Sequence, residues 1–232
     1  MRILKHKRIE KEFEFDCELN YYLSIENPQF YREFITEVLS PTDDDSSNIS
    51  LFENGKKRKI SKNLCFIPDP LCFAWDEKKL NASIQKDLAS SIDTQENEKF
   101  LSLRNEINDY LESISYDYPL KLSYDSERNL GSFLKAFSIS YETRTDNFLL
   151  TILEKIKILS SIFKYNTFII LNLADFLTKD ELNNFFYELR KMEVSVLILS
   201  SHLPSYDFDN KSIIRIDNDL CELHIESKNE KD

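Results

Sequence analysis

Residues 165–202 read YNTFIILNLADFLTKDELNNFFYELRKMEVSVLILSSH and contain two apolar runs on either side of an amphipathic segment. The runs, residues 167–173 and 194–199, are short and almost free of polar side chains, which is typical of strands buried on both faces of a parallel sheet. Between them, Thr178 and Glu181 have the spacing of a capping box, so we predict that a helix begins there. Strand, helix and strand in this order predict an α/β fold with a mainly parallel sheet.

The order of elements in this stretch resembles the last third of a P-loop ATPase, but the residues that such an enzyme uses to bind Mg²⁺ and phosphate are missing. The first run ends in Asn172, where such ATPases carry the carboxylate that holds Mg²⁺, and the second leads into His202. A phosphate-binding loop needs glycines and a lysine, but the only glycines are Gly55 and Gly131, and residues 26–28 read ENP. We therefore expect a degenerate P-loop-ATPase-like head with no nucleotide site, no catalytic residues and no enzymatic activity. His202 is then a polar residue at the end of a strand.

Composition indicates a folded protein without a membrane segment. The chain has 232 residues, 41% of them hydrophobic, and a formal net charge of -11. It lacks 18 consecutive apolar residues and an apolar segment near the N-terminus, so we expect a cytoplasmic protein. The four cysteines form no Cys-x-x-Cys pair and lie in or beside apolar runs, which predicts buried, reduced thiols: Cys17, Cys65, Cys72 and Cys221.

Other segments extend the α/β pattern. We predict strands at 19–25 and 64–67, helices from Pro28 and over 147–163, and a C-terminal hairpin of residues 213–216 and 220–225. Acidic residues in the loop 43–48 are interpreted as a solvated turn, because adjacent carboxylates cannot all point at one ion.

Residues 76–115 differ in composition from the rest of the chain. They are polar and charged, with a thin apolar stripe at helical spacing that is interrupted near residues 93–96. This pattern predicts an αα-hairpin, and the stripe is too narrow to cover itself, which implies a partner surface. The predicted organisation is an α/β head domain of residues 1–75 and 116–232 with a projecting αα-hairpin leg of residues 76–115.

Positive charge is concentrated in two places. Asn54-Gly55 is a strong hairpin signal, so residues 49–53 and 56–60 should pair as a β-ribbon that carries a dense cluster of cations: Lys56, Lys57, Arg58 and Lys59, extended by Lys62. A second group precedes a strand predicted from alternating Phe13, Phe15, Cys17 and Leu19; it comprises Arg2, Lys5, Lys7, Arg8 and Lys11. Such groups are either solvated faces or binding sites for an anionic partner.

Several short motifs together resemble a known family. They are the sequence FLTKDE at 176–181, four residues after a strand that ends in Asn172, then Tyr141-Glu142-Thr143 with Thr145-Asp146, Tyr124-Asp125 and Tyr206-Asp207. In their order and spacing, and in the missing phosphate loop, they are similar to the ring-forming, DNA-end-binding adaptation protein of type II-A CRISPR systems. The likeness extends over nearly the whole chain.

The resemblance implies a homotetrameric ring that threads double-stranded DNA, loads at free ends and acts in spacer acquisition with the adaptation integrase and the RNA-guided nuclease. The hairpin cations would then contact DNA phosphates. The family also binds Ca²⁺ through carboxylates, and Asp125 and Glu142 match acidic positions of the family. Two neighbouring positions that are acidic in relatives are Lys121 and Ser123 here, so Glu127 and Asp146 are the candidates to replace them.

Two functions therefore stay open. One is a non-enzymatic, sequence-independent clamp on double-stranded DNA ends. The other is a pseudo-ATPase scaffold or regulatory subunit, which would bind protein partners through the helical leg without touching DNA.

Overall fold

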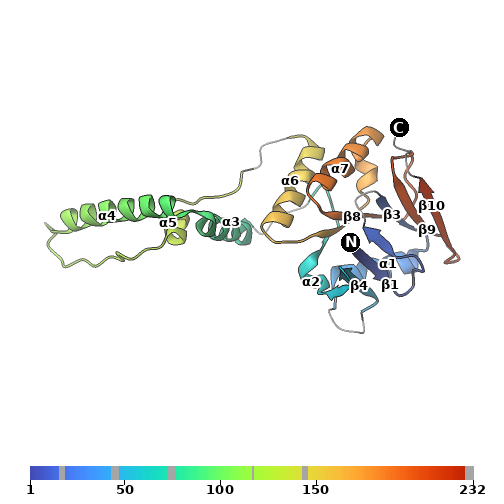
Figure 1. The fold of residues 1–232 in the computed structure, drawn as a ribbon, viewed down its shortest axis with the longest axis horizontal. Helices are drawn as coiled ribbons and strands as arrows, with labels where there is room; N and C mark the ends of the chain where they lie inside the picture. Colours follow the sequence, from blue (N-terminus) through green and yellow to red (C-terminus); the bar gives the residue numbers. More distant parts are fainter. Residues whose placement is uncertain (16–18, 43–46, 73–76, 117, 143–145, 228–232) are drawn as a thin grey trace. The chain divides into compact units, whose positions relative to one another are not determined.

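The chain forms two compact units in a computed structural model that describes residues 1–15, 19–42, 47–72, 77–116, 118–142 and 146–227. Unit 1 comprises Met1–Ala74 and Thr145–Asp232, and unit 2 comprises Trp75–Arg144 (Figure 1). Some residues used above lie outside the described residues: Cys17 of the N-terminal strand, residues 43–46 of the acidic loop, and Thr143 and Thr145 of the family motif.

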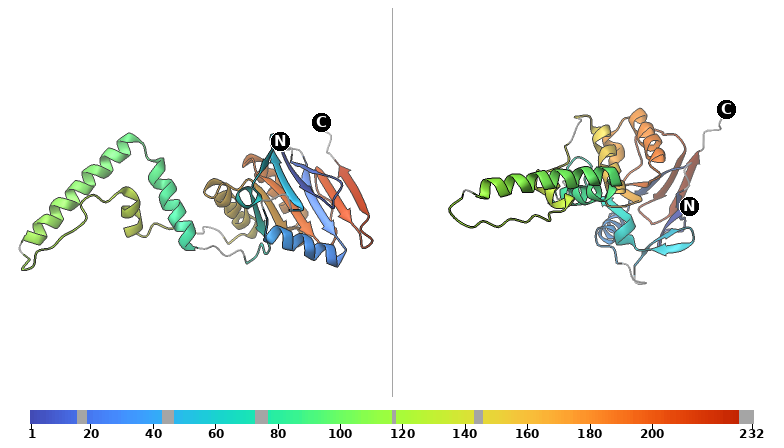
Figure 2. Two further views of the ribbon diagram at one scale, coloured as in Figure 1. Left: turned by 90° about the horizontal axis from the view of Figure 1, so that it is seen from below. Right: turned by 60° about the vertical axis from the view of Figure 1, so that its left-hand side comes forward.

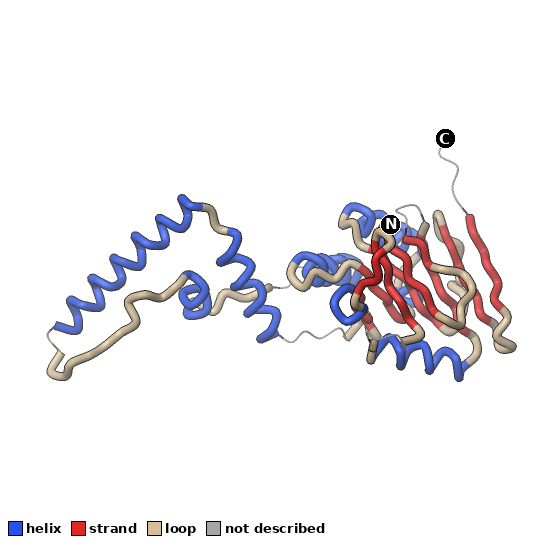
Figure 3. The backbone as a smooth tube through the Cα atoms, turned by 60° about the horizontal axis from the view of Figure 1, so that its bottom comes forward, coloured by secondary structure: helices blue, strands red, loops and turns tan. Residues whose placement is uncertain are grey.

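A sheet forms the centre of unit 1 (Figure 3). It has six strands in the order β10-β9-β3-β8-β7-β6. Five strands run parallel: β3 (Asn20–Ile25), β6 (Leu64–Ile67), β7 (Thr167–Leu171), β8 (Ser195–Ser200) and β9 (Lys211–Ile216). The edge strand β10 (Glu222–Ser227) is antiparallel to β9. Every residue of β3 and β8 is buried, because helices and a second sheet cover both faces. The predicted parallel sheet and terminal hairpin are confirmed.

Two layers enclose this sheet. On one face, helix α1 (Pro28–Leu39) and a small antiparallel sheet share a core with β3 and β8, for example Phe34, Leu51, Leu23 and Leu197. On the other face lie α6 (Phe148–Ser161) and α7 (Lys179–Lys191), which contact each other (Figure 1). The predicted capping box is present, because the Thr178 hydroxyl accepts from the Glu181 N–H at 3.3 Å and the Glu181 carboxylate accepts from the Thr178 N–H at 2.9 Å.

The small sheet has the order β2-β1-β4-β5. Its strands are β1 (Arg2–His6), β2 (Phe13–Phe15), β4 (Ile49–Glu53) and β5 (Lys56–Arg58). The predicted ribbon is confirmed, although β5 ends at Arg58 because helix α2 (Ile60–Asn63) begins with the buried Ile60. Strand β1 was not predicted, and the basic N-terminal residues lie on it or just after it.

Unit 2 contains α3 (Glu77–Ser91), α4 (Thr94–Tyr116) and α5 (Leu130–Ala136). The two predicted helices and the break between them are confirmed, but their pairing as a hairpin is wrong. Helices α3 and α4 diverge from the break, and α3 contacts α5 (Figure 2). Unit 2 is also longer than the predicted leg, because the segment after α4 packs back on it: the Tyr124 hydroxyl donates to the Asn108 carbonyl at 3.2 Å.

The cysteine prediction is wrong for two of the three described thiols. Cys72 and Cys221 are exposed, because both lie in short connections outside the sheet core. Cys65 is half-buried on β6, and burial raises its pKa to about 12. Among the described helices, none has the length and apolar character needed to cross a membrane.

Candidate nucleic-acid interface

The basic hairpin β4–β5 is closed by a turn that only certain residues allow. Asn54 and Gly55 both have positive φ, 51° and 75°, which is the backbone of the two-residue turn that matches the twist of the strands. In the register, Lys57 lies opposite Phe52, and Lys56 lies opposite Glu53. Because side chains alternate along a strand, Lys57 projects to the face opposite that of Lys56 and Arg58. The hairpin is therefore a rigid support that presents cations on both of its faces.

All five predicted DNA-contacting cations are exposed: Lys56, Lys57, Arg58, Lys59 and Lys62. Arg58 is partly neutralised, because its guanidinium lies 2.9 Å from the Glu53 carboxylate. Hydrogen bonding from Arg2 and the charges of Arg2 and Arg58 hold the pKa of Glu53 below its ordinary value. Lys56, Lys59 and Lys62 have no carboxylate within 4.0 Å among the residues that the structure describes. These three ammonium groups therefore have charge available for an external anion.

The N-terminal basic group differs in this respect. Four of its cations form ion pairs within unit 1: Arg2 with Glu53, Lys5 with Glu12, Arg8 with Glu33, and Lys11 with Glu226. Arg8 also lies over the Phe30 ring, with 4.1 Å between the guanidinium carbon and the ring centroid. These side chains are committed to internal contacts. The hairpin is consequently the better candidate for an anionic partner.

The four carboxylates proposed for Ca²⁺ are all exposed. Asp125 lies 4.0 Å from the Arg128 guanidinium, and its carboxylate also accepts from the Glu127 N–H. The Glu127 carboxylate lies 3.5 Å from Arg104. Glu142 belongs to unit 2, like these residues, whereas Asp146 belongs to unit 1. Within the described ranges, no three acidic, histidine or cysteine side chains gather as a metal site. The described residues therefore show no preformed calcium site, and calcium binding stays a prediction.

The carboxyl ends of β3, β7 and β8 meet at the edge where doubly wound sheets hold their ligands. Asn172 follows β7 with a left-handed backbone, φ 53° and ψ 24°, and its side-chain oxygen lies 3.4 Å from the Tyr31 hydroxyl. Tyr22 is fully buried and donates to the His202 carbonyl at 2.9 Å. Burial raises the pKa of Tyr22 to about 12, so this phenol stays protonated. The side chains of Asn172, Tyr31 and Tyr22 at this edge are therefore already engaged in contacts within the protein.

A contact that the sequence did not reveal joins Asp175 to His202 at this edge. The His202 Nε2 atom lies 2.9 Å from the Asp175 carboxylate, and Nδ1 lies 3.3 and 3.4 Å from the hydroxyls of Ser200 and Ser201. These hydroxyl contacts are long for hydrogen bonds of this kind, and Ser200 is fully buried. Ser200 therefore cannot reach a substrate as a nucleophile, whereas Ser201 is exposed. The absence of enzymatic activity stays a prediction.

Fold and surface together define a class: an α/β protein with a doubly covered, mainly parallel sheet, a basic hairpin and a helical second unit. A family model described as CRISPR-associated protein (Cas_Csn2) matches residues 42–220, which is most of the chain. The chain therefore belongs to this CRISPR-associated family, as the resemblance predicted. The match includes the basic hairpin and all of unit 2.

No curated protein matches the sequence. Among solved structures, the chain is similar to a Pyrococcus furiosus protein assigned to ABC transporters as an ATP-binding protein, with 12% identity over 90% of this chain and 96% of that one and a TM-score of 0.40.

Proposed function

We propose that the protein is a non-enzymatic clamp that binds double-stranded DNA independently of sequence and acts at DNA ends during CRISPR spacer acquisition. One observation carries the proposal: Lys56, Lys59 and Lys62 lie exposed on a rigid hairpin and the adjoining α2, without an internal ion pair among the described residues. Clustered like charges repel each other, and a row of phosphates relieves that repulsion. Contacts to phosphates alone read no sequence.

The proposal includes a homotetrameric ring. Each copy carries a net charge of -11, so isolated copies repel DNA. A ring overcomes this repulsion because each copy turns its few cations inward, while screening over about 8 Å at physiological salt hides the acidic outer surface from the channel. The same proposal includes a degenerate P-loop-ATPase-like fold for the head. It also includes two protein partners, the adaptation integrase and the RNA-guided nuclease, and membership of the family supports both parts.

Unit 2 supports the assembly. Helix α4 has 23 residues and none of them is buried, and its exposed apolar side chains include Leu103, Tyr110 and Ile114. A helix with so much uncovered apolar surface needs a partner surface. The same observation favours the second candidate function, a pseudo-ATPase scaffold that binds proteins through unit 2 without DNA.

DNA binding separates the two functions. We expect the wild-type protein to retard linear duplex in a mobility-shift assay and to bind covalently closed circular duplex of the same sequence weakly, because a closed ring needs an end for loading. A variant with Lys57→Glu and Lys59→Glu should lose affinity for linear duplex. The matched control carries the same charge change on α6 and the residues just after it, Lys157→Glu with Lys164→Glu, and should bind as the wild type does.

The outcomes distinguish the candidates. If the wild type retards neither DNA form but gel filtration still shows an oligomer, the scaffold function replaces the clamp. If linear and circular duplex bind equally, the protein binds DNA but does not load at ends.

Calcium stays part of the proposal, through Asp125, Glu127, Glu142 and Asp146. Hard cations such as Ca²⁺ take six to eight oxygen ligands, and binding to the folded state raises stability by mass action. We expect Ca²⁺ to raise the melting temperature of the tetramer and a chelator to lower it, with Asp125→Asn and Glu142→Gln removing the response. Unchanged melting and assembly under chelation would show that this member lacks the site.

A further inference from the structure

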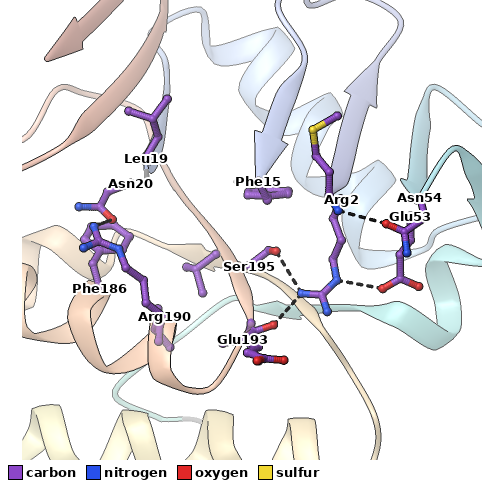
Figure 4. A pocket seen from close by; sticks show the side chains of 14 residues that line it. Arg2, Phe15, Leu19, Asn20, Glu53, Asn54, Phe186, Arg190, Glu193 and Ser195 are labelled. Carbon is purple, nitrogen blue, oxygen red and sulfur yellow. Dashed lines mark hydrogen bonds and ion pairs between the residues drawn. The ribbon is translucent and has the colours of Figure 1, made fainter. Parts of the chain in front are cut away.

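A cavity of about 310 Å³ opens at the amino ends of β3 and β8, away from the carboxyl edge, and Asn54 of the hairpin turn is one of its lining residues (Figure 4). Half of its fourteen lining residues are apolar: Met1, Phe15, Leu19, Phe186, Leu189, Val194 and Val196. The other half are polar or charged, so the cavity is more polar than most small-molecule sites, and its volume lies at the lower end of their range of roughly 300–1,000 Å³.

Two arginines border the cavity, and their situations differ (Figure 4). Arg2 is engaged through two of its three nitrogens: Nε donates to Glu53 at 3.1 Å, and one terminal nitrogen contacts the Glu193 carbonyl at 2.7 Å, the Asn166 carbonyl at 3.3 Å and the Ser195 hydroxyl at 3.4 Å. This arginine joins the small sheet to the central sheet. Its charge is already balanced by the Glu53 carboxylate.

The Arg190 side chain is held in place by a hydrogen bond, but no described carboxylate balances its charge. One terminal nitrogen donates at 2.8 Å to the side-chain oxygen of Asn20, which is 3% exposed and itself held by donation to the Asp209 carbonyl at 2.6 Å. Among the described residues, no carboxylate lies within 4.0 Å of its guanidinium. A neutral buried amide thus orients a cation at the rim of a cavity whose lining is half apolar, and the other donors of that cation stay available.

We propose that this cavity binds a carboxylate carried on a compact apolar group, with Arg190 as the anion-binding residue. The guanidinium fork matches the geometry of a carboxylate, and the apolar walls would receive the group attached to it. A free organic acid and the C-terminal apolar residue of a partner chain share this chemistry. Glu193 is the lining carboxylate without an ion pair in the described structure, so its removal should strengthen binding.

The test uses the full chain and two matched probes, 3-phenylpropionate and its uncharged amide, in ligand-observed NMR titrations. We expect the acid to bind and the amide to bind at least about tenfold more weakly, because charge-assisted hydrogen bonds are lost. Arg190→Gln should weaken the acid by a similar factor, and Glu193→Gln should strengthen it. Lys191→Gln is the control: it removes the same charge one residue away, outside the cavity lining, and should leave the affinity unchanged.

A second variant keeps the test decisive if Arg190→Gln unfolds. Val194→Phe keeps Arg190 and fills the cavity, so it should abolish binding of the acid. A tetrapeptide that ends in Phe with a free carboxylate, compared with its C-terminal amide, distinguishes a partner's C-terminus from a free organic acid as the ligand. Tighter binding of the peptide acid than of 3-phenylpropionate would identify the ligand as a chain terminus. Binding of 3-phenylpropionate without binding of the peptide acid would identify it as a small molecule. Equal affinity for acid and amide, or an affinity that Arg190→Gln leaves unchanged in folded protein, would overturn the proposal.

Discussion

His6 is the residue whose environment most clearly couples folding to pH. It is 4% exposed and packs beside the rings of Phe30 and Phe34, whose centroids lie 5.5 and 5.2 Å from its own. Its Nδ1 accepts from the Arg8 N–H at 3.1 Å, and its Nε2 lies 2.8 Å from the Glu37 carboxylate. A neutral ring with the proton on Nε2 satisfies both contacts. Burial lowers the pKa of His6 below its ordinary value of 6.5, despite the opposing influence of Glu37.

The lowered pKa predicts how stability depends on pH. Below about pH 6.5 the unfolded chain binds a proton at this histidine before the folded chain does, so the contribution of His6 is present above that pH and is lost as the pH falls. Replacing His6 by Gln keeps a donor toward Glu37 and removes the titration. We expect about 1 kcal/mol lower stability at pH 7 and a shallower loss between pH 6.5 and 5, measured by urea denaturation. Parallel pH profiles for variant and wild type would contradict this.

Some contacts of individual residues could be predicted from the sequence, and others could not. The hairpin cations were identifiable because Asn54-Gly55 and four consecutive cations are local signals. The pairing of Asp175 with His202, the Arg190–Asn20 contact and the ion pairs of Arg2 and Lys11 join residues far apart in the chain. No local pattern encodes them, because the sheet order brings the partners together.

At the scale of elements, the strands that are buried on both faces were the easiest to predict from the sequence. Strands β7 and β8 are covered on both faces, so their sequences are continuous apolar runs that can be recognised without knowing their partners. Strand β1 has the sequence RILKH and depends on pairing with β4, 43 or more residues away. Helix α5 had one local signal that was not used: Asn129 caps it by accepting from the Ser132 N–H at 2.9 Å. The hairpin pairing of α3 and α4 was wrong because a narrow stripe does not specify which surface covers it.

The capping box at the start of helix α7 allows the contribution of one local sequence signal to the free energy of unfolding to be measured. Because the Thr178 hydroxyl satisfies a backbone N–H at the start of the helix, Thr178→Ala should lower the free energy of unfolding by about 1 kcal/mol. The control is Thr36→Ala in the exposed interior of α1, where the hydroxyl donates to the Arg32 carbonyl and its loss should change stability by less than about 0.5 kcal/mol. Equal effects of the two substitutions in chemical denaturation would show that the cap contributes nothing specific.

At the scale of the whole molecule, α4 should determine assembly. Leu103 and Tyr110 are 44% and 65% exposed and lie seven residues apart, so they share one helix face. Burying two carboxylates in an apolar interface is strongly unfavourable, so Leu103→Glu with Tyr110→Glu should dissociate the proposed tetramer, as measured by light scattering after gel filtration. Ser102→Glu with Asn105→Glu adds the same charge at exposed polar positions of α4 and should leave the mass unchanged. An unaltered mass for the first variant would place the interface elsewhere.

Salt dependence tests the clamp as an assembly, since it counts the phosphates that all copies neutralise together. If each copy of a tetramer neutralises about two phosphates through the hairpin, about eight counterions are released and log K should fall with log[salt] at a slope near -7. Lys57→Glu with Lys59→Glu should flatten that slope and weaken binding to every sequence alike, while the tetramer persists because the proposed interface on α4 is unchanged. The α6 control, Lys157→Glu with Lys164→Glu, should keep the wild-type slope. If both double variants shift the slope equally, the response reports net charge alone, and the hairpin does not face the DNA.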